Sequence, residues 1–126
     1  MEVVKGNEQL DEKEVEIAQE EAKKEEDSGF NYKLKKPVQY NGKEYMELYF
    51  DFNSLTGGDA LDVEDEMQRQ GKGTVVVAAF NSEYLIRISA RACREKVGAD
   101  IFRYMSLFDY NRIRDRARNF LLRAEQ

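Results

Sequence analysis

The sequence contains no histidine and no tryptophan, and it has one cysteine and one proline. Without histidine, the chain lacks the most common general base of a nucleophilic triad and a frequent zinc ligand. Its single cysteine, Cys93, cannot form an internal disulfide, which excludes a disulfide-stapled scaffold. We therefore expect a protein that is not an enzyme and that holds no metal or cofactor.

Long apolar runs are absent as well. The longest, residues 75–80, is far shorter than the roughly 18–20 residues that span a bilayer. The N-terminus has no signal-peptide core. With 126 residues, the chain has the size of one small domain. We expect a soluble, intracellular protein that does not contact a membrane.

Charge is distributed unevenly along the chain. Residues 1–31 hold 11 acidic and 4 basic side chains, whereas residues 81–126 hold 6 acidic and 10 basic ones, within a net charge of −5. Apolar side chains in residues 1–31 form at best a thin stripe, which contributes little packing energy. We expect residues 1–31 to be an acidic arm, helical or disordered, next to a single domain formed by residues 32–126.

A β-hairpin over residues 32–52 is the strongest local prediction. Apolar and aromatic residues alternate with polar ones on both sides of Asn41 and Gly42. These two residues tolerate the positive φ angles of a two-residue type I′ turn. Pro37 cannot donate a ladder hydrogen bond, so we expect the first strand to lie at an edge or to be bulged there.

A first helix is expected after the hairpin, at residues 60–70. Thr56 or Asp59 is its candidate N-cap, and the glycines at 71 and 73 end it. The β-branched residues that follow predict a third strand or an extended approach to the next helix, at 74–80.

The C-terminal third is predicted to be helical. A helix with a wide apolar face is expected from Asn81 or Ser82 to about Lys96, with Gly98 after it. A short helix follows at 100–104, and the pair Ser106 and Asp109 resembles the capped start of a last helix. The predicted core residues are Leu48, Leu85, Ile88, Ile113, Phe120 and Leu121. The fold class is therefore α+β, with a β-hairpin packed on three to four helices.

Three further groups have both a chemical and a structural interpretation. Four acidic residues between 62 and 66 suggest a divalent cation site, but consecutive acids on a helix point outward, which favours a solvated face. Cys93 is expected to be a buried core residue rather than a reactive thiol. Five aromatic residues in and after the hairpin are expected in the core rather than stacked on bases: Tyr40, Tyr45, Tyr49, Phe50 and Phe52.

Arginines supply the candidate partner-binding residues. Three of them recur at i, i+4 and i+7 in the expected helix 81–96, and others share a face of the last helix. Such stripes contact phosphates, the acids of the N-terminal arm or an acidic partner protein, or they are merely solvated. The overall acidity of the chain disfavours nucleic acid. The candidates are Arg87, Arg91, Arg94, Arg112 and Arg116.

Four pieces of the sequence together resemble a known family. The first is Lys35-Lys36-Pro37-Val38-Gln39-Tyr40-Asn41-Gly42-Lys43-Glu44-Tyr45-Met46-Glu47-Leu48, followed by Leu55-Thr56-Gly57-Gly58-Asp59. The others are Tyr84-Leu85 with Ala90-Arg91-Ala92, Leu107 with Asp109-Tyr110, and Asn119-Phe120-Leu121-Leu122. Their order and spacing, over about residues 33–123, resemble the tail assembly chaperones of long-tailed bacteriophages and prophages. The acidic arm lies outside this pattern, and Asp51-Phe52-Asn53 replaces a basic stretch that some members carry.

The resemblance implies a non-enzymatic assembly factor in the cytoplasm of the host bacterium, absent from the mature virion. Such a chaperone binds the tape measure protein, keeps it soluble and helps to recruit tail tube subunits. It acts through protein–protein contacts, without nucleic acid or membrane, and a homo-oligomer is one further arrangement that it allows. Two alternatives stay open: a small nucleic-acid-binding regulator that uses the C-terminal arginines, and a head–tail structural component of the virion.

Overall fold

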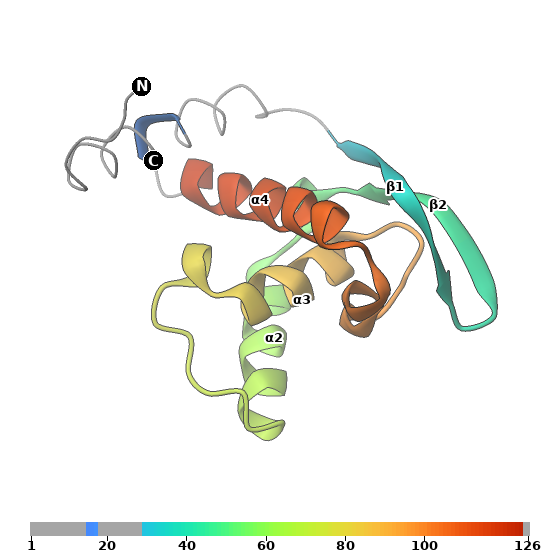
Figure 1. Ribbon diagram of the computed structural model, residues 1–126. Coiled ribbons are helices and arrows are strands. Elements are labelled where there is room, and N and C mark those ends of the chain that lie inside the picture. Colours follow the sequence, from blue (N-terminus) through green and yellow to red (C-terminus); the bar gives the residue numbers. More distant parts are fainter. Residues whose placement is uncertain (1–14, 18–28, 125–126) are drawn as a thin grey trace.

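The computed structural model describes residues 15–17 and 29–124, and the fold is α+β, as predicted (Figure 1). Residues 15–17 are helical with exposed side chains. The prediction of a helical or disordered arm at residues 1–14 and 18–28 lies outside the described residues. In chain order, the elements are β1 (Phe30–Tyr40), β2 (Lys43–Phe50), η1 (Phe52–Ser54), α2 (Gly57–Arg69), η2 (Ala78–Phe80), α3 (Ser82–Ala92), η3 (Ala99–Tyr104) and α4 (Leu107–Ala124).

Strands β1 and β2 form the predicted antiparallel hairpin. Asn41 and Gly42 have φ angles of 51° and 77°, the positive values that a tight turn between twisted strands requires. The pairing register shifts between Lys33 and Val38, so the first strand is bulged around Pro37, as predicted. Strand β1 begins at Phe30, so the last two residues assigned to the arm belong to the hairpin.

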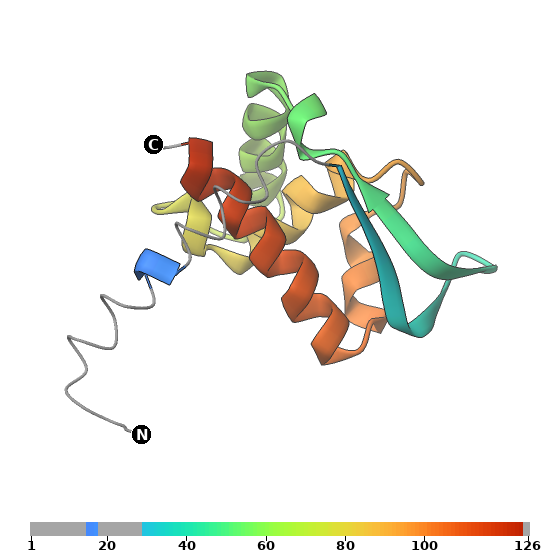
Figure 2. The same cartoon turned by 90° about the horizontal axis from the view of Figure 1, so that it is seen from above.

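The hairpin contacts the helical layer as far as Tyr40, whose hydroxyl donates to Asp100 of η3 at 2.5 Å. Its turn projects away from the helices, whereas its open end lies against them (Figures 1 and 2). Aromatic rings continue from that open end into the helical layer. Phe50 stacks on Phe52 with ring centroids 6.0 Å apart, and Phe52 stacks on Phe120 of α4 at 5.6 Å. This row of rings joins β2, η1 and α4.

Helix α2 begins with a capping box. The Thr56 side chain accepts a hydrogen bond from the Asp59 backbone N–H, and the Asp59 carboxylate accepts one from the Thr56 N–H at 2.8 Å. Thr56 is therefore the N-cap, and Asp59 is the third helical residue. After α2, no strand forms at residues 74–80; within the described chain the sheet has only two strands. The extended approach, ending in η2, is the alternative that the structure takes.

Helix α3 ends four residues before the predicted Lys96. Asn81 caps its start, as expected, but Cys93 already has an extended backbone and pairs with Phe50. The N–H of Arg94 donates to the carbonyl of Tyr49 at 2.7 Å. The chain leaves the helix because it bonds to the end of β2, a non-local interaction that the helical periodicity could not reveal.

Four of the six predicted core residues are buried: Leu48, Leu85, Ile88 and Ile113. The prediction is wrong for Phe120 and Leu121, which are half-buried and pack at the edge of the core. Of the hairpin aromatics, Phe50 and Phe52 are buried, whereas the three tyrosines are half-buried. The largest fully buried apolar side chains that the prediction omitted are Met67, Ile101, Val38 and Val63.

Asp109 is a fully buried carboxylate that joins the first strand to the last helix. Its N–H donates to the Ser106 hydroxyl, which donates back to the carboxylate at 3.0 Å. The carboxylate also accepts hydrogen bonds from the Tyr32 hydroxyl at 2.6 Å and from the N–H groups of Lys35 and Lys36 at 3.0 and 3.2 Å. Burial by itself raises the pKa of Asp109, but the hydrogen bonds outweigh it and lower this pKa below its ordinary value.

Within the described ranges, no helix has both the length and the apolar character needed to cross a membrane.

The difference in burial between two rings of the aromatic row gives a test of the core. We predict that Phe50→Ala lowers the free energy of unfolding by about 3–5 kcal/mol, because Phe50 is fully buried. Phe120→Ala should cost roughly half as much, because that side chain already contacts solvent. Urea unfolding of both variants measures the two losses. If both variants lost the same free energy of unfolding, the Phe120 side chain would contribute as much to the core as the fully buried Phe50, which would contradict this prediction.

A second prediction concerns the buried carboxylate. Asp109→Asn should lower the free energy of unfolding by about 1–3 kcal/mol at neutral pH, because an amide cannot accept every hydrogen bond that Asp109 accepts. The contribution of Asp109 is present above the ordinary carboxyl pKa of 3.8 and is lost as pH falls through the lower pKa of the folded state. The gap between wild type and variant should therefore narrow below about pH 4. Asp65→Asn, at an exposed carboxylate of α2, is the control. If the difference in unfolding free energy between wild type and Asp109→Asn did not change with pH, the ionised Asp109 carboxylate would not stabilise the fold.

Candidate protein-binding site

Arg87 is not a freely solvated arginine, because its guanidinium group is held between α2 and α3. It donates to Glu83 at 2.7 Å, to Glu66 at 3.3 Å and to the Gln70 side-chain oxygen at 2.7 Å. Only 11% of its side chain is exposed. Arg87 therefore uses its charge inside the chain, to join the two helices.

Arg91 makes a second connection between the same helices. Its guanidinium group lies 2.9 Å from Asp59, 3.1 Å from Asp62 and 3.6 Å from Glu66. The hydrogen bond from the Thr56 N–H and the one from Arg91 hold the pKa of Asp59 below its ordinary value. Several acids of α2, expected to form a solvated face, thus pair with arginines of α3.

The predicted stripe of three arginines does not form. Arg94 lies beyond the end of α3, and its guanidinium group stacks 3.9 Å from the centroid of the Tyr49 ring. The geometric expectation was wrong because the helix ends at Ala92. Arg87 and Arg91 remain on one helix, but they face α2.

Arg112 and Arg116 lie on a different face, with aromatic rings. Arg112 lies 5.7 Å from the centroid of the Phe108 ring, and the Lys35 ammonium group lies 4.5 Å from the same ring. Arg116 lies 4.1 Å above Phe30. Because Lys35 comes from β1, the sequence pattern of α4 alone did not reveal this mixed basic and aromatic face.

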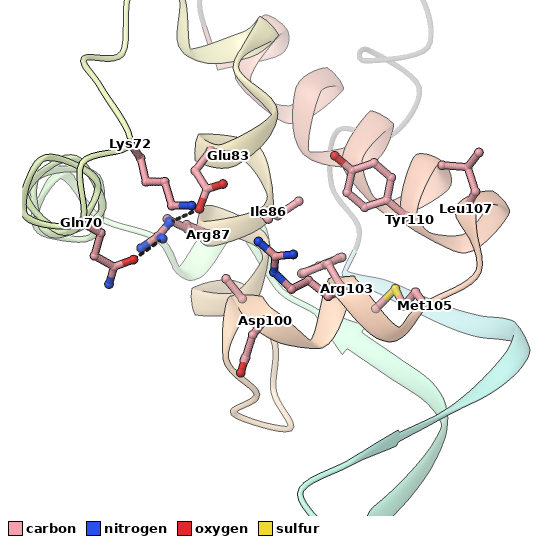
Figure 3. Close-up of a pocket in the computed structure, with 12 residues that line it drawn as sticks. Gln70, Lys72, Glu83, Ile86, Arg87, Asp100, Arg103, Met105, Leu107 and Tyr110 are labelled. Atoms are coloured by element: carbon pink, nitrogen blue, oxygen red, sulfur yellow. Dashed lines mark hydrogen bonds and ion pairs between the residues drawn. The ribbon is translucent and has the colours of Figure 1, made fainter.

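A pocket of about 500 Å³ opens between α3, η3, the start of α4 and the segment that follows α2 (Figure 3). Its walls include the apolar or aromatic residues Ile86, Ala99, Phe102, Met105, Leu107 and Tyr110. Its charged residues are Lys72, Glu83, Arg87, Asp100 and Arg103. This combination of apolar walls and a charged rim suits an amphipathic protein segment.

Of the sequence-predicted residues, only Arg87 lines this pocket. The other residues that line the pocket come from separate parts of the chain and meet only in the folded structure. One signal was present in the sequence: Leu107, at the start of the last helix, does not share the helical stripe of Ile113 and Ala117. In the structure its side chain is 71% exposed. An apolar residue at such a position is available to a partner.

The other chemically notable groups serve the fold. Cys93 is buried, as expected, and burial raises the pKa of its thiol to about 12, so the thiol stays protonated at neutral pH. In residues 15–17 and 29–124, no three acidic or cysteine side chains come together as metal ligands would.

Comparisons of the chain with protein-family models, with curated proteins and with solved structures find no match.

The two helix-joining arginines should differ in their effect on stability. Arg87→Ala should lower the free energy of unfolding by about 1–3 kcal/mol, because it leaves partly buried hydrogen-bonding groups without a partner. Arg91→Ala should cost less than about 1 kcal/mol, because its pairs are more exposed. Thermal and urea unfolding measure both effects. If both variants kept wild-type stability, these ion pairs would not join α2 to α3, and the arginines would be available to a partner.

Proposed function

We propose that this protein is a tail assembly chaperone of a long-tailed bacteriophage or prophage, and that it binds the tape measure protein. The observation that carries the proposal is the pocket between α3, η3 and α4, because its apolar walls suit the side chains of a helical partner. The sequence resemblance over about residues 33–123 supplies the identity of that partner.

The exposed apolar residues around the pocket support protein binding. Leu107, which lines the pocket, is 71% exposed. Ile86 and Met105 are half-buried beside the core and line the same hollow. Exposed apolar residues that adjoin a pocket are typical of a surface that another protein covers.

A long helical partner explains why one small pocket is sufficient. A tape measure protein presents apolar stripes that self-associate in water unless they are covered. One pocket of this size gives modest affinity, but many copies bound along one helix cover the whole stripe. In this proposal the chaperone acts in the host cytoplasm, helps to recruit tail tube subunits and is not retained in the virion.

The experiment is co-expression with the tape measure protein of the same phage or prophage. Wild-type chain should keep that protein in the soluble fraction and co-purify with it. Leu107→Ser should reduce co-purification about ten-fold or more, because it removes an exposed apolar contact. Leu61→Ser is the matched control, since Leu61 is 69% exposed on α2, outside the pocket lining.

Two results would contradict the proposal. One is a tape measure protein that stays insoluble when the folded wild-type chain is present. The other is recovery of the chain in purified virions at the copy number of a structural component, which would favour the head–tail alternative. Salt-sensitive retention on DNA would instead favour the regulator.

A further inference from the structure

The charges that line the pocket are not equivalent. Both of its acids are already engaged: Glu83 accepts a hydrogen bond from Arg87 at 2.7 Å, and Asp100 accepts one from the Tyr40 hydroxyl at 2.5 Å. Arg87 in turn donates hydrogen bonds to Glu83, Glu66 and Gln70. The acids of the pocket therefore have partners within this chain.

Arg103 is in a different position. Among the described residues its side chain has no hydrogen-bond or ion-pair partner, and the same holds for the side chain of Lys72 at the other end of the pocket. Arg103 comes from η3 and directs its guanidinium group into the space between α3 and α4 (Figure 3). Its neighbours in the lining are apolar, Ile86 and Met105 among them. The unmatched charge of the pocket is thus positive and lies beside its apolar walls.

We propose that the pocket selects a partner helix that carries a carboxylate next to its apolar anchor residues, and that Arg103 binds this carboxylate. The inference rests on the proposed function for the statement that the partner is a helix. When apolar anchors fill the pocket, they exclude water around Arg103. The ion pair then forms in a medium of lower dielectric, where it is stronger than on an open surface.

Helix geometry fixes where the carboxylate belongs. Residues three or four positions apart lie on the same side of a helix, so a Glu or Asp three or four positions from an anchor reaches the rim while the anchor enters the pocket. The apolar walls of the pocket suit anchor side chains, which makes it a poor site for the continuous phosphates of a nucleic acid. The charge pattern therefore favours an acidic amphipathic helix.

The test uses the full chain and two synthetic peptides labelled with a fluorophore. Both are amphipathic helices with identical leucines, and the positions that flank the leucines carry Glu in one peptide and Lys in the other. Fluorescence anisotropy should show that the wild type binds the Glu peptide about ten-fold or more tightly than the Lys peptide. This preference should shrink as salt concentration rises.

Charge reversal at one residue should reverse the preference. Arg103→Glu should bind the Lys peptide more tightly, and Arg103→Gln should bind both peptides about equally. Arg103 is exposed, so both variants should fold, which circular dichroism checks. Arg69→Glu, the same change at an exposed arginine of α2, should keep the wild-type preference.

Several results would overturn the inference. They are equal binding of the two peptides by wild type, no binding of either peptide, or a Glu preference that survives Arg103→Glu. The peptide experiment and the co-expression experiment can fail independently of each other. A wild type that solubilises the tape measure protein but ignores peptide charge loses only the role of Arg103. A clear Glu preference, switched by Arg103, without any effect on the tape measure protein overturns only the proposed partner.

Discussion

The contact between the Asp109 carboxylate and the bulge of β1 sets the geometry of this domain. Around Pro37 the strand leaves its regular register, and the N–H groups of Lys35 and Lys36 turn to the carboxylate. A buried charge is stable only when hydrogen bonds replace its lost hydration, and the bulge supplies them. Because Asp109 sits in the first turn of α4, the same contact fixes where Leu107 and Phe108 emerge. One borders the pocket, and the other lies in the mixed basic and aromatic face.

A second set of contacts holds the opposite side of the domain. Helices α2 and α3 are joined by Arg87 and Arg91, and the chain after α3 returns to the hairpin through the pairing of Cys93 with Phe50. Glu95 strengthens this return by accepting the N–H of Tyr49 at 3.0 Å. The charged side chains of this domain therefore have two roles, one in joining helices and one in the proposed binding of a partner. Those at the α2–α3 contact are matched within the chain, whereas Arg103 keeps its charge for a group from outside.

Sequence reasoning succeeded where structure is encoded locally. The turn at Asn41 and Gly42 follows from the φ angles that these residues tolerate, and the Pro37 bulge follows from a missing N–H. It failed where distant segments meet. The apolar periodicity of residues 82–96 does not predict that Cys93 leaves the helix and pairs with Phe50. The error in the helix end also misplaced Arg94. The pocket escaped prediction for the same reason, since its walls come from four separate segments.

The residues that hold the fold and those offered to a partner are largely different residues. Leu107 and Arg103 are exposed and contribute little to the core, so water is their neighbour in the free protein. Met105 and Ile86 are shared, because each packs on the core with one side and lines the pocket with the other. Because its wall residues pack on the core, the pocket is already formed before a partner binds. Binding then costs the conformational entropy of the partner helix, but little additional entropy of this domain. Preformed walls suit the repeated, modest binding that the proposed covering of a long partner helix requires.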